Sequence, residues 1–319
     1  MRSRDPVVLT EAVLGGDRAS LPRLLSVVEA GGVQAREVGR RVYTRSRGAY
    51  TVGITGPPGA GKSTLADRII ASLRQQGSEV AVLAVDPSSP YSGGALLGDR
   101  VRMMDHALDG GVFVRSMATR GHLGGLALAV PEVLRVLDAA GFPTVLVETV
   151  GVGQSEVEIA AATDTTVVML TPGAGDSVQA NKAGLLEVAD VFVINKADHP
   201  QTAELERDLR FMMELTTWPD GWRPPIVRAV AREGSGVAEM LAAVSAHRAH
   251  LTSTGLLDER RARRALDELR RVLVALFEAR ARRAVGDARW AALMSAVAGR
   301  EIDPWTAADE ILEGLAGGA

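Results

Sequence analysis

The sequence contains no cysteine and only 5 histidines among its 319 residues. The absence of cysteine excludes disulfides, thiolate-bound zinc, iron–sulfur clusters and cysteine nucleophiles. So few histidines also make a carrier of soft metal ions difficult to build. This composition is compatible with the reducing environment of the cytoplasm.

The chain also lacks a long apolar segment and an excess of basic charge. No stretch approaches the roughly 20 apolar residues that span a bilayer, and the start, MRSRDPVVLTEAVLGGD, lacks the apolar core of a signal peptide. The formal net charge is −3 at pH 7, so no overall basic field attracts nucleic acid or anionic lipid. We therefore expect a cytoplasmic protein that binds neither a membrane nor nucleic acid.

Hydrophobic residues make up 46% of the chain, and they follow two different periodic patterns. Residues 8–47 show apolar residues at helical spacing, with a break at Gly31-Gly32. Between residues 50 and 230, short β-branched runs alternate with longer helical stretches; the runs are YTVGIT, EVAVLAV, GVFV, PTVLVET, TTVVML, DVFVIN and PIVRAV. This alternation predicts an α/β fold with a mostly parallel sheet covered by helices on both faces.

After about residue 250 no strand-like run appears. Residues 258–283 carry an apolar seam at alternating four- and three-residue steps, formed by Ala262, Leu266, Leu269, Leu273 and Leu276. Either the seam packs on its own domain or it pairs with a second subunit. Nucleic-acid binding by the arginines of this segment is disfavoured, because acidic residues are interleaved with them and no aromatic platform accompanies them. We expect three parts: an N-terminal helical extension (1–47), a central α/β domain (48–250) and a C-terminal helical arm (251–319).

A phosphate-binding loop is indicated between the first apolar run and the next helix. The sequence there fits G-x-x-x-x-G-K-[ST], in the strand-to-helix position that a Walker A loop requires. Glycines let backbone N–H groups converge on phosphate oxygens, the lysine adds charge at the β- and γ-phosphates, and the serine hydroxyl can bind Mg²⁺. A plain turn has no use for a lysine followed by a hydroxyl. The loop residues are Gly56, Pro57, Pro58, Gly59, Ala60, Gly61, Lys62, Ser63 and Thr64.

The segment VFVINKADHP predicts which base is bound. Its N-K-x-D arrangement consists of Asn195, Lys196 and Asp198 at the end of an apolar strand. A carboxylate there can accept both N1–H and the 2-amino group of guanine, whereas adenine would leave it unpaired. Asn195 is expected to bind neighbouring backbone and Lys196 to lie along the base. Alone the tetrapeptide is a weak signal, but after a Walker loop it favours guanine.

A third base-side element is expected after the next strand, in IVRAVAREGSG. We expect the backbone N–H of Ala231 to donate to guanine O6, with Val230 and Arg232 on either side.

Carboxylates at or near strand ends are candidates for the metal site. Asp86 and Glu148 each end a strand, and Asp99 follows a glycine-rich stretch. Carboxylates at these strand ends face the phosphates, and Mg²⁺ prefers hard oxygen ligands. Each carboxylate has an alternative role as a helix cap or solvated loop residue.

The segment ETVGVG is similar to the D-x-x-G switch with glutamate in place of aspartate. Gly151 is then placed to sense the γ-phosphate, and Val152 stands where Ras-type enzymes have a water-orienting glutamine, so intrinsic hydrolysis should be slow. In residues 171–184, Lys182 either reaches the transition-state charge or is an exposed helix residue.

The ordered motifs GPPGAGKST, VDPSSPYSGGALLGDR, RGHLGGLA, VETVGVGQSE, PGAGDSVQ and NKAD resemble those of the MeaB-type GTPases, a family of P-loop proteins. The resemblance runs from about residue 8 to 315. Proteins of this family are chaperones of adenosylcobalamin-dependent methylmalonyl-CoA mutase, akin to the methylmalonic aciduria type A protein.

The resemblance implies a P-loop GTPase that binds GTP or GDP with Mg²⁺ and forms a homodimer through its C-terminal arm. GTP-binding residues fall on residues 56–64, 195, 196, 198 and 230–232, and the metal ligands on Ser63, Asp86, Asp99 and Glu148. The catalytic switch lysine falls on Lys182, beside the expected catalytic roles of Lys62 and Glu148. Relatives usually have Ser-Ala-Arg where this chain has Val230-Ala231-Arg232, which removes a hydroxyl but keeps the backbone donor.

The expected function is GTP hydrolysis that gates loading and protection of adenosylcobalamin on the mutase or a related B12-dependent acyl-CoA mutase. Three alternatives compete with it. A kinase or ATPase acting on a transport-associated binding protein conflicts with the guanine preference. Nickel insertases carry cysteine or histidine clusters that are missing here. A module without turnover is disfavoured by the intact Lys62, Ser63 and Glu148.

Overall fold

The structure is a computed structural model that describes residues 5–87, 106, 108–119, 125–149, 155–173 and 186–316. The elements in chain order are α1 (Pro6–Leu14), α2 (Leu21–Ala30), α3 (Gly32–Val42), η1 (Tyr43–Arg45), β1 (Tyr50–Thr55), α4 (Lys62–Gln75), β2 (Val80–Pro87), β3 (Val112–Thr119), α6 (Gly125–Ala139), β4 (Thr144–Thr149), α7 (Ser155–Ala162), β5 (Thr165–Leu170), β6 (Val191–Ile194), α9 (Thr202–Glu214), β7 (Ile226–Arg228), η3 (Ala231–Glu233), α10 (Val237–Thr254), α11 (Leu256–Val285), α12 (Asp287–Ala298) and α13 (Pro304–Ala316).

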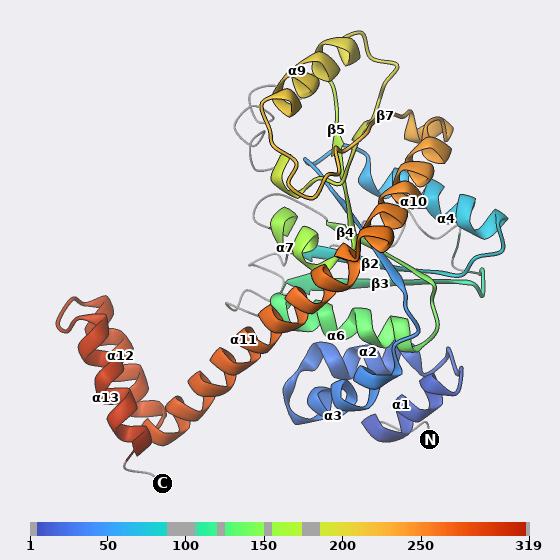
Figure 1. Cartoon of the computed structure of the whole chain (residues 1–319). Helices are drawn as coiled ribbons and strands as arrows, with labels where there is room; N and C mark the ends of the chain where they lie inside the picture. Colours follow the sequence, from blue (N-terminus) through green and yellow to red (C-terminus); the bar gives the residue numbers. More distant parts are fainter. Residues whose placement is uncertain are drawn as a thin grey trace. The chain divides into compact units, whose positions relative to one another are not determined.

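The seven strands form one sheet in the order β3-β2-β4-β1-β5-β6-β7, and every neighbouring pair is parallel (Figure 1). This confirms the predicted parallel sheet, and each strand falls on one of the seven predicted runs. The first strand, β1, lies between β4 and β5. Because the carboxyl ends of parallel strands meet at one edge, the end of β4 and the loops after β1 and β6 come together there.

Helices cover both faces of the sheet, which explains why the strands are apolar throughout instead of alternating. One core joins inward residues of β2 and β4 to α6 and the three N-terminal helices. The other core joins the opposite side of β1, β2 and β5 to α4 and α10. A smaller cluster packs α9 beside β5 and β6. The sheet is thus fixed by a separate hydrophobic core on each of its two faces.

The N-terminal helices α1, α2 and α3 pack on one another and on α6, which lies between them and the sheet (Figure 1). The predicted break between α2 and α3 is present, with Gly31 at φ 71°. A second break, which the helical spacing did not indicate, separates α1 from α2. There the carboxylate of Asp17 accepts hydrogen bonds from the Ala19 N–H and the Ser20 hydroxyl, and this local bonding competes with helix formation.

The chain divides into two compact units, residues 1–262 and 263–319, and α11 runs through both. In the second unit, α12 and α13 pack together with Ala281, Leu293 and Ala307 buried. Several large apolar side chains of α11 are exposed in the single chain, namely Leu266, Leu269, Leu273, Val274, Leu276 and Phe277. Within the described part of the chain, no helix combines the length and apolar character needed to cross a membrane.

Candidate nucleotide site

The loop between β1 and α4 is constrained by close packing at its first glycine. Gly56 has φ 139°, in the region that favours glycine, and a Cβ atom there would collide with the backbone carbonyl oxygen of Met169 on β5. The chain can therefore turn away from β1 at this point only without a side chain. The backbone N–H groups of the turn precede the N-terminus of α4, the arrangement that binds phosphate.

Lys62 is the first residue of α4 and its side chain folds back over the loop. Its Nζ donates to the carbonyl oxygens of Gly56, at 2.7 Å, and Pro57, at 3.1 Å. Only 6% of the residue is exposed. Both of these acceptors are neutral, so an anionic ligand in the loop would stabilise the buried ammonium group further.

Ser63 and Glu148 bring two hard oxygen donors together beside Lys62. The Ser63 hydroxyl donates to Oε1 of Glu148 at 2.6 Å, and the two residues are 8% and 1% exposed. Glu148 sits near the end of β4, which pairs directly with β1. A hydroxyl and a carboxylate at this spacing, next to a phosphate-binding loop, suit Mg²⁺, which is bound through oxygen in sites completed by phosphate and water.

Asn195 connects the phosphate loop to the loop after β7. Its amide nitrogen donates to the carbonyl of Ala60 at 2.7 Å, and its amide oxygen accepts from the Ala231 N–H at 2.9 Å. A Cβ atom on Gly61 would collide with the same amide group. Asn195 is 3% exposed, so this single side chain fixes the spacing of three loops within the protein interior.

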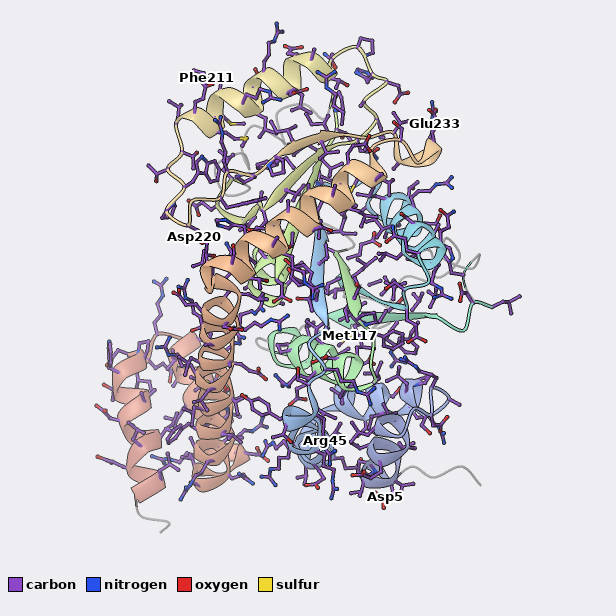
Figure 2. The ribbon with its side chains drawn as sticks, turned by 45° about the vertical axis from the view of Figure 1, so that its right-hand side comes forward. Asp5, Arg45, Met117, Phe211, Asp220 and Glu233 are labelled. Atoms are coloured by element: carbon purple, nitrogen blue, oxygen red, sulfur yellow. The ribbon has the colours of Figure 1, made fainter. Side chains whose placement is uncertain are left out.

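The loop that follows Asn195 presents its charged side chains to solvent. Lys196 has a left-handed backbone with φ 57°, and the Ala197 N–H donates to the carbonyl of Ala229 at 3.0 Å. The Asp198 carboxylate lies 3.3 Å from Nη2 of Arg232, and the side chains of this pair are 51% and 72% exposed. Figure 2 labels Glu233, which follows Arg232 in η3. The carboxylate is accessible to a ligand because such an exposed ion pair is weak.

Comparison with known proteins identifies the family. The sequence profile of the family described as methylmalonyl Co-A mutase-associated GTPase MeaB matches residues 21–285. The chain belongs to this MeaB family. Its resemblance to the family, predicted from the motifs, is thereby confirmed, and the chain is a P-loop GTPase that binds guanine nucleotide.

Relatives and a solved structure extend the match beyond the profile. A putative GTPase of Pyrococcus abyssi is 45% identical over 313 residues, covering 97% of both chains. The mitochondrial methylmalonic aciduria type A homolog of Mus musculus is 36% identical over 250 residues, covering 73% of this chain and 60% of the relative. The crystal structure of an LAO/AO transport system kinase matches with a TM-score of 0.72 and 26% identity over 98% of both chains. The predicted P-loop fold class is confirmed by this structural match.

The backbone N–H of Ala231, predicted to donate to guanine O6, already makes another hydrogen bond in the structure of this MeaB-family protein. Its N–H donates to Asn195, so donation to guanine O6 requires that N–H to change or share its partner. The neighbouring Val230 N–H donates to the carbonyl of Ser235 at 3.1 Å. The assignment of this loop to the base stays a prediction.

Arg68 supports the loop after β7, a role that the sequence did not predict. Its Nη2 donates to the carbonyl of Arg232 at 2.8 Å and so joins α4 to η3. The two residues are 164 positions apart, and nothing in the local sequence of α4 indicates the contact. Arg68 thus supports the third loop from the helix that begins at the phosphates.

Four predicted site residues fall wholly or partly outside the described structure. Asp86 lies in β2, but its side chain is not described. Asp99, Gly151 and Lys182 lie outside the described residues. The remaining predicted residues all belong to the three loops that meet at Asn195, or to Ser63 and Glu148 beside them.

The distribution of lysine points to the same site. Of the 36 basic residues in the chain only three are lysines, Lys62, Lys182 and Lys196, and arginine supplies the other positive charges. All three lie in motifs assigned to the nucleotide. The sequence predicts contact with phosphate for Lys62 and with the base for Lys196, and it leaves Lys182 either a catalytic residue or an exposed helix residue.

Proposed function

We propose that this MeaB-family GTPase is a chaperone that gates loading and protection of adenosylcobalamin on methylmalonyl-CoA mutase or a related B12-dependent acyl-CoA mutase. The observation that carries the nucleotide switch is the double hydrogen bond of Asn195, which joins the phosphate loop to the base-side loop. The partner is supported by the family description and by the name of the mouse relative.

Residues 56–64 hold the phosphates in this proposal, and Asp198 selects guanine. Ser63 and Glu148 would hold Mg²⁺, with Asp86 and Asp99 as further candidates. The ion supplies positive charge to the β- and γ-phosphate oxygens when it is bound. The nucleotide phosphates draw the Lys62 ammonium away from the two carbonyl groups that accept its hydrogen bonds in the structure.

Hydrolysis in this proposal ends a contact that depends on the γ-phosphate. Gly151 donates its N–H to that phosphate, and Lys182 adds positive charge during the reaction. Val152 cannot orient a water molecule, so basal turnover is slow and the partner or another loop completes the site. GTP binding and turnover then alter the complex with the mutase, so that intact cofactor is loaded and damaged cofactor is released.

The proposed quaternary structure is a homodimer formed through the C-terminal arm, residues 251–319. Its support is the row of exposed apolar side chains on α11, such as Leu269 and Phe277, at the spacing of a helix that pairs with another. The proposed domains remain 1–47, 48–250 and 251–319.

The test is a coupled measurement with a purified B12-dependent methylmalonyl-CoA mutase. We expect GTP but not ATP to be hydrolysed, and the GTPase rate to rise when the mutase is added. We also expect transfer of adenosylcobalamin to the mutase to depend on hydrolysable GTP. Equal cofactor loading with and without this protein would contradict the chaperone role while leaving the GTPase assignment intact.

A second candidate is a kinase or ATPase that acts on a transport-associated binding protein. It is favoured only by the name of the matched crystal structure, an LAO/AO transport system kinase. In that case radioactive γ-phosphate would appear on a binding protein instead of as free phosphate. The two functions are therefore separated by following where the label goes.

A further inference from the structure

The segment formed by α3, η1 and the two residues that follow carries a concentration of positive charge. Residues 32–47 contain five arginines and one glutamate, whereas the whole chain has a net charge of −3. The inner face of α3, formed by Ala35, Val38 and Val42, is buried. Its arginines are consequently displayed on the opposite side, where solvent or a partner can reach them.

Three of these arginines have no partner among the described residues. Arg36, Arg40 and Arg45 are exposed, and none makes an ion pair or hydrogen bond with the part of the chain that the structure describes. Arg41, on the same helix, differs: it pairs with Glu37 at 2.8 Å and Glu11 at 3.4 Å. The unpaired positions are thus distinct from an ordinary salt-bridged helix surface.

Nearby carboxylates are already engaged. Glu37 is held by Arg41, and Asp138 of α6 accepts hydrogen bonds from the Ser46 hydroxyl and from the backbone N–H groups of Arg47 and Ala49. Glu132 of α6 lies against Gly39, which directly precedes Arg40 on α3, and it already has contacts of its own. Within the described part of the chain, no carboxylate therefore forms an ion pair with Arg36, Arg40 or Arg45.

Arg36 and Arg40 are one helical turn apart, a spacing at which like charges repel and destabilise the helix. An external carboxylate placed between them would convert this repulsion into two charge-assisted hydrogen bonds. The same face displays Tyr43, 60% exposed, and Val33, 82% exposed. Arginine and tyrosine are among the residues most often found at the energetic centre of protein interfaces.

We infer that this arginine face, composed of Val33, Arg36, Arg40, Tyr43 and Arg45, docks an acidic surface of a partner protein (Figure 2 labels Arg45). The inference rests on the proposed function in one respect: the partner is taken to be the client mutase. An exposed helix face with aromatic and aliphatic side chains beside its arginines suits a protein surface.

Nucleic acid fits these observations less well. Three unpaired arginines provide fewer phosphate contacts than the roughly 6–10 made by proteins that bind DNA strongly. The net charge of −3 would also repel a polyanion as it approaches. An acidic protein patch needs only a few carboxylates opposite the arginines.

The test compares charge reversals at two pairs of exposed arginines in the full chain. The variant Arg36→Glu with Arg40→Glu removes the central pair of the arginine face. The matched control is Arg207→Glu with Arg223→Glu, which changes the same charge at two other exposed arginines without partners among the described residues. Thermal melting and basal GTP hydrolysis are expected to stay unchanged in both, since none of these side chains belongs to the nucleotide site.

Binding to purified mutase is measured by biolayer interferometry at low and at high NaCl concentration. We expect the Arg36/Arg40 variant to bind about 10- to 100-fold more weakly at low salt, as for loss of central interface residues, with a smaller difference at high salt. The control should bind like the unaltered protein. The same proteins are tested against a short DNA duplex and phosphatidylglycerol vesicles.

Each other outcome overturns the inference in a different way. If the unaltered protein does not bind the mutase, the proposed function fails and the assigned partner with it. If it binds and the Arg36/Arg40 variant binds equally well, only the docking surface is wrong. Equal weakening by both variants would indicate a general charge effect, and a loss confined to DNA or vesicles would assign the face to a different partner.

Discussion

The Ser63 hydroxyl donates a 2.6 Å hydrogen bond to Oε1 of Glu148, joining the first turn of α4 to the end of β4 in the interior. The contact places a hydroxyl oxygen and a carboxyl oxygen at the point where the phosphate loop meets the central strands. Because Glu148 is 1% exposed, its charge depends on the groups beside it for stabilisation.

We expect Glu148→Gln to lower the GTPase rate by about 100-fold or more, since the change removes a negative ligand and a fixed charge at the reacting phosphates. Phosphate release at saturating Mg²⁺ gives the rate, and fluorescent GTP binding in EDTA gives the metal-independent affinity. That affinity should change little. The control Glu204→Gln, on exposed α9, should keep full activity; full activity of Glu148→Gln would remove this residue from the metal site.

Asp198→Asn should change the base that the protein accepts. The carboxylate accepts two hydrogen bonds from guanine in our assignment, and an amide can accept only on one side while donating on the other. Loss of charge-assisted bonds of about 1.5–3 kcal/mol predicts GTP affinity lower by at least about tenfold. Xanthosine triphosphate, with a carbonyl in place of the 2-amino group, should bind better than to the unaltered protein. Unchanged preference for GTP over the xanthine analogue would show that another residue recognises the base.

Asn195→Ala should destabilise the protein as well as weaken nucleotide binding. The change leaves the Ala60 carbonyl and the Ala231 N–H without their present partner, and each buried unsatisfied group costs about 1–3 kcal/mol. We expect the free energy of unfolding to fall by about 2–4 kcal/mol in urea denaturation with the slope unchanged. Gln201→Ala, at an exposed position, serves as the control. A stability equal to that of the control would mean that Asn195 does not hold the loops together.

The sheet and the phosphate loop were accessible from sequence because both depend on local patterns. Seven apolar β-branched runs mark the strands, and the Walker spacing marks the turn after β1. Long-range polar contacts leave no such pattern. The contact of Arg68 with Arg232 spans 164 residues, and the engagement of the Ala231 N–H by Asn195 spans 36. The sequence predicts that Asn195 binds backbone, but only the three-dimensional structure identifies its partners as the Ala60 carbonyl and the Ala231 N–H.

The same limit applies to a polar cluster at the other end of the sheet. His247 of α10 lies within 2.8 Å of the Thr165 hydroxyl and 3.2 Å of Asp190, beside the ring of Trp222. Asp190 also binds Arg260, at 3.1 Å. No spacing in the sequence joins these residues, although Thr165 begins β5 and Asp190 directly precedes β6.

His247 predicts a specific dependence of stability on pH. Burial, followed by the nearby positive charge of Arg260, lowers the pKa of His247 to about 3. In the unfolded chain its pKa returns to about 6.5, so between these values the unfolded state binds the extra proton. This contribution to stability is present above a pH of about 6.5 and is lost at up to about 1.4 kcal/mol per pH unit as the pH falls toward about 3.

Asp190 has the opposite effect on the free energy of unfolding. Burial raises its pKa, so on acidification the folded state takes up this proton before the unfolded state does and is stabilised by it. The His247 effect is therefore isolated by comparing urea unfolding of the unaltered protein and His247→Gln between about pH 7 and pH 4.5, inside the window of the shifted pKa. The unaltered protein should show the steeper loss of stability. Parallel curves would mean that His247 binds its proton equally well in the folded and the unfolded protein, so that burial does not lower its pKa.

Two of the three lysines, Lys62 and Lys196, allow the phosphate and base assignments to be tested separately. Lys196 is exposed, whereas Lys62 is 6% exposed with its Nζ bound to two carbonyls. Acetylation by a water-soluble ester, followed by mass spectrometry, should therefore modify Lys196 quickly and Lys62 slowly.

GTP with Mg²⁺ should protect both lysines from acetylation. The phosphates would cover Lys62 and the guanine plane would cover Lys196. The N-terminal amine serves as an internal control. ATP at the same concentration should leave Lys196 as reactive as before, because adenine offers Asp198 no pair of donors. Equal protection of Lys196 by both nucleotides would show that the N-K-x-D loop does not distinguish the purines.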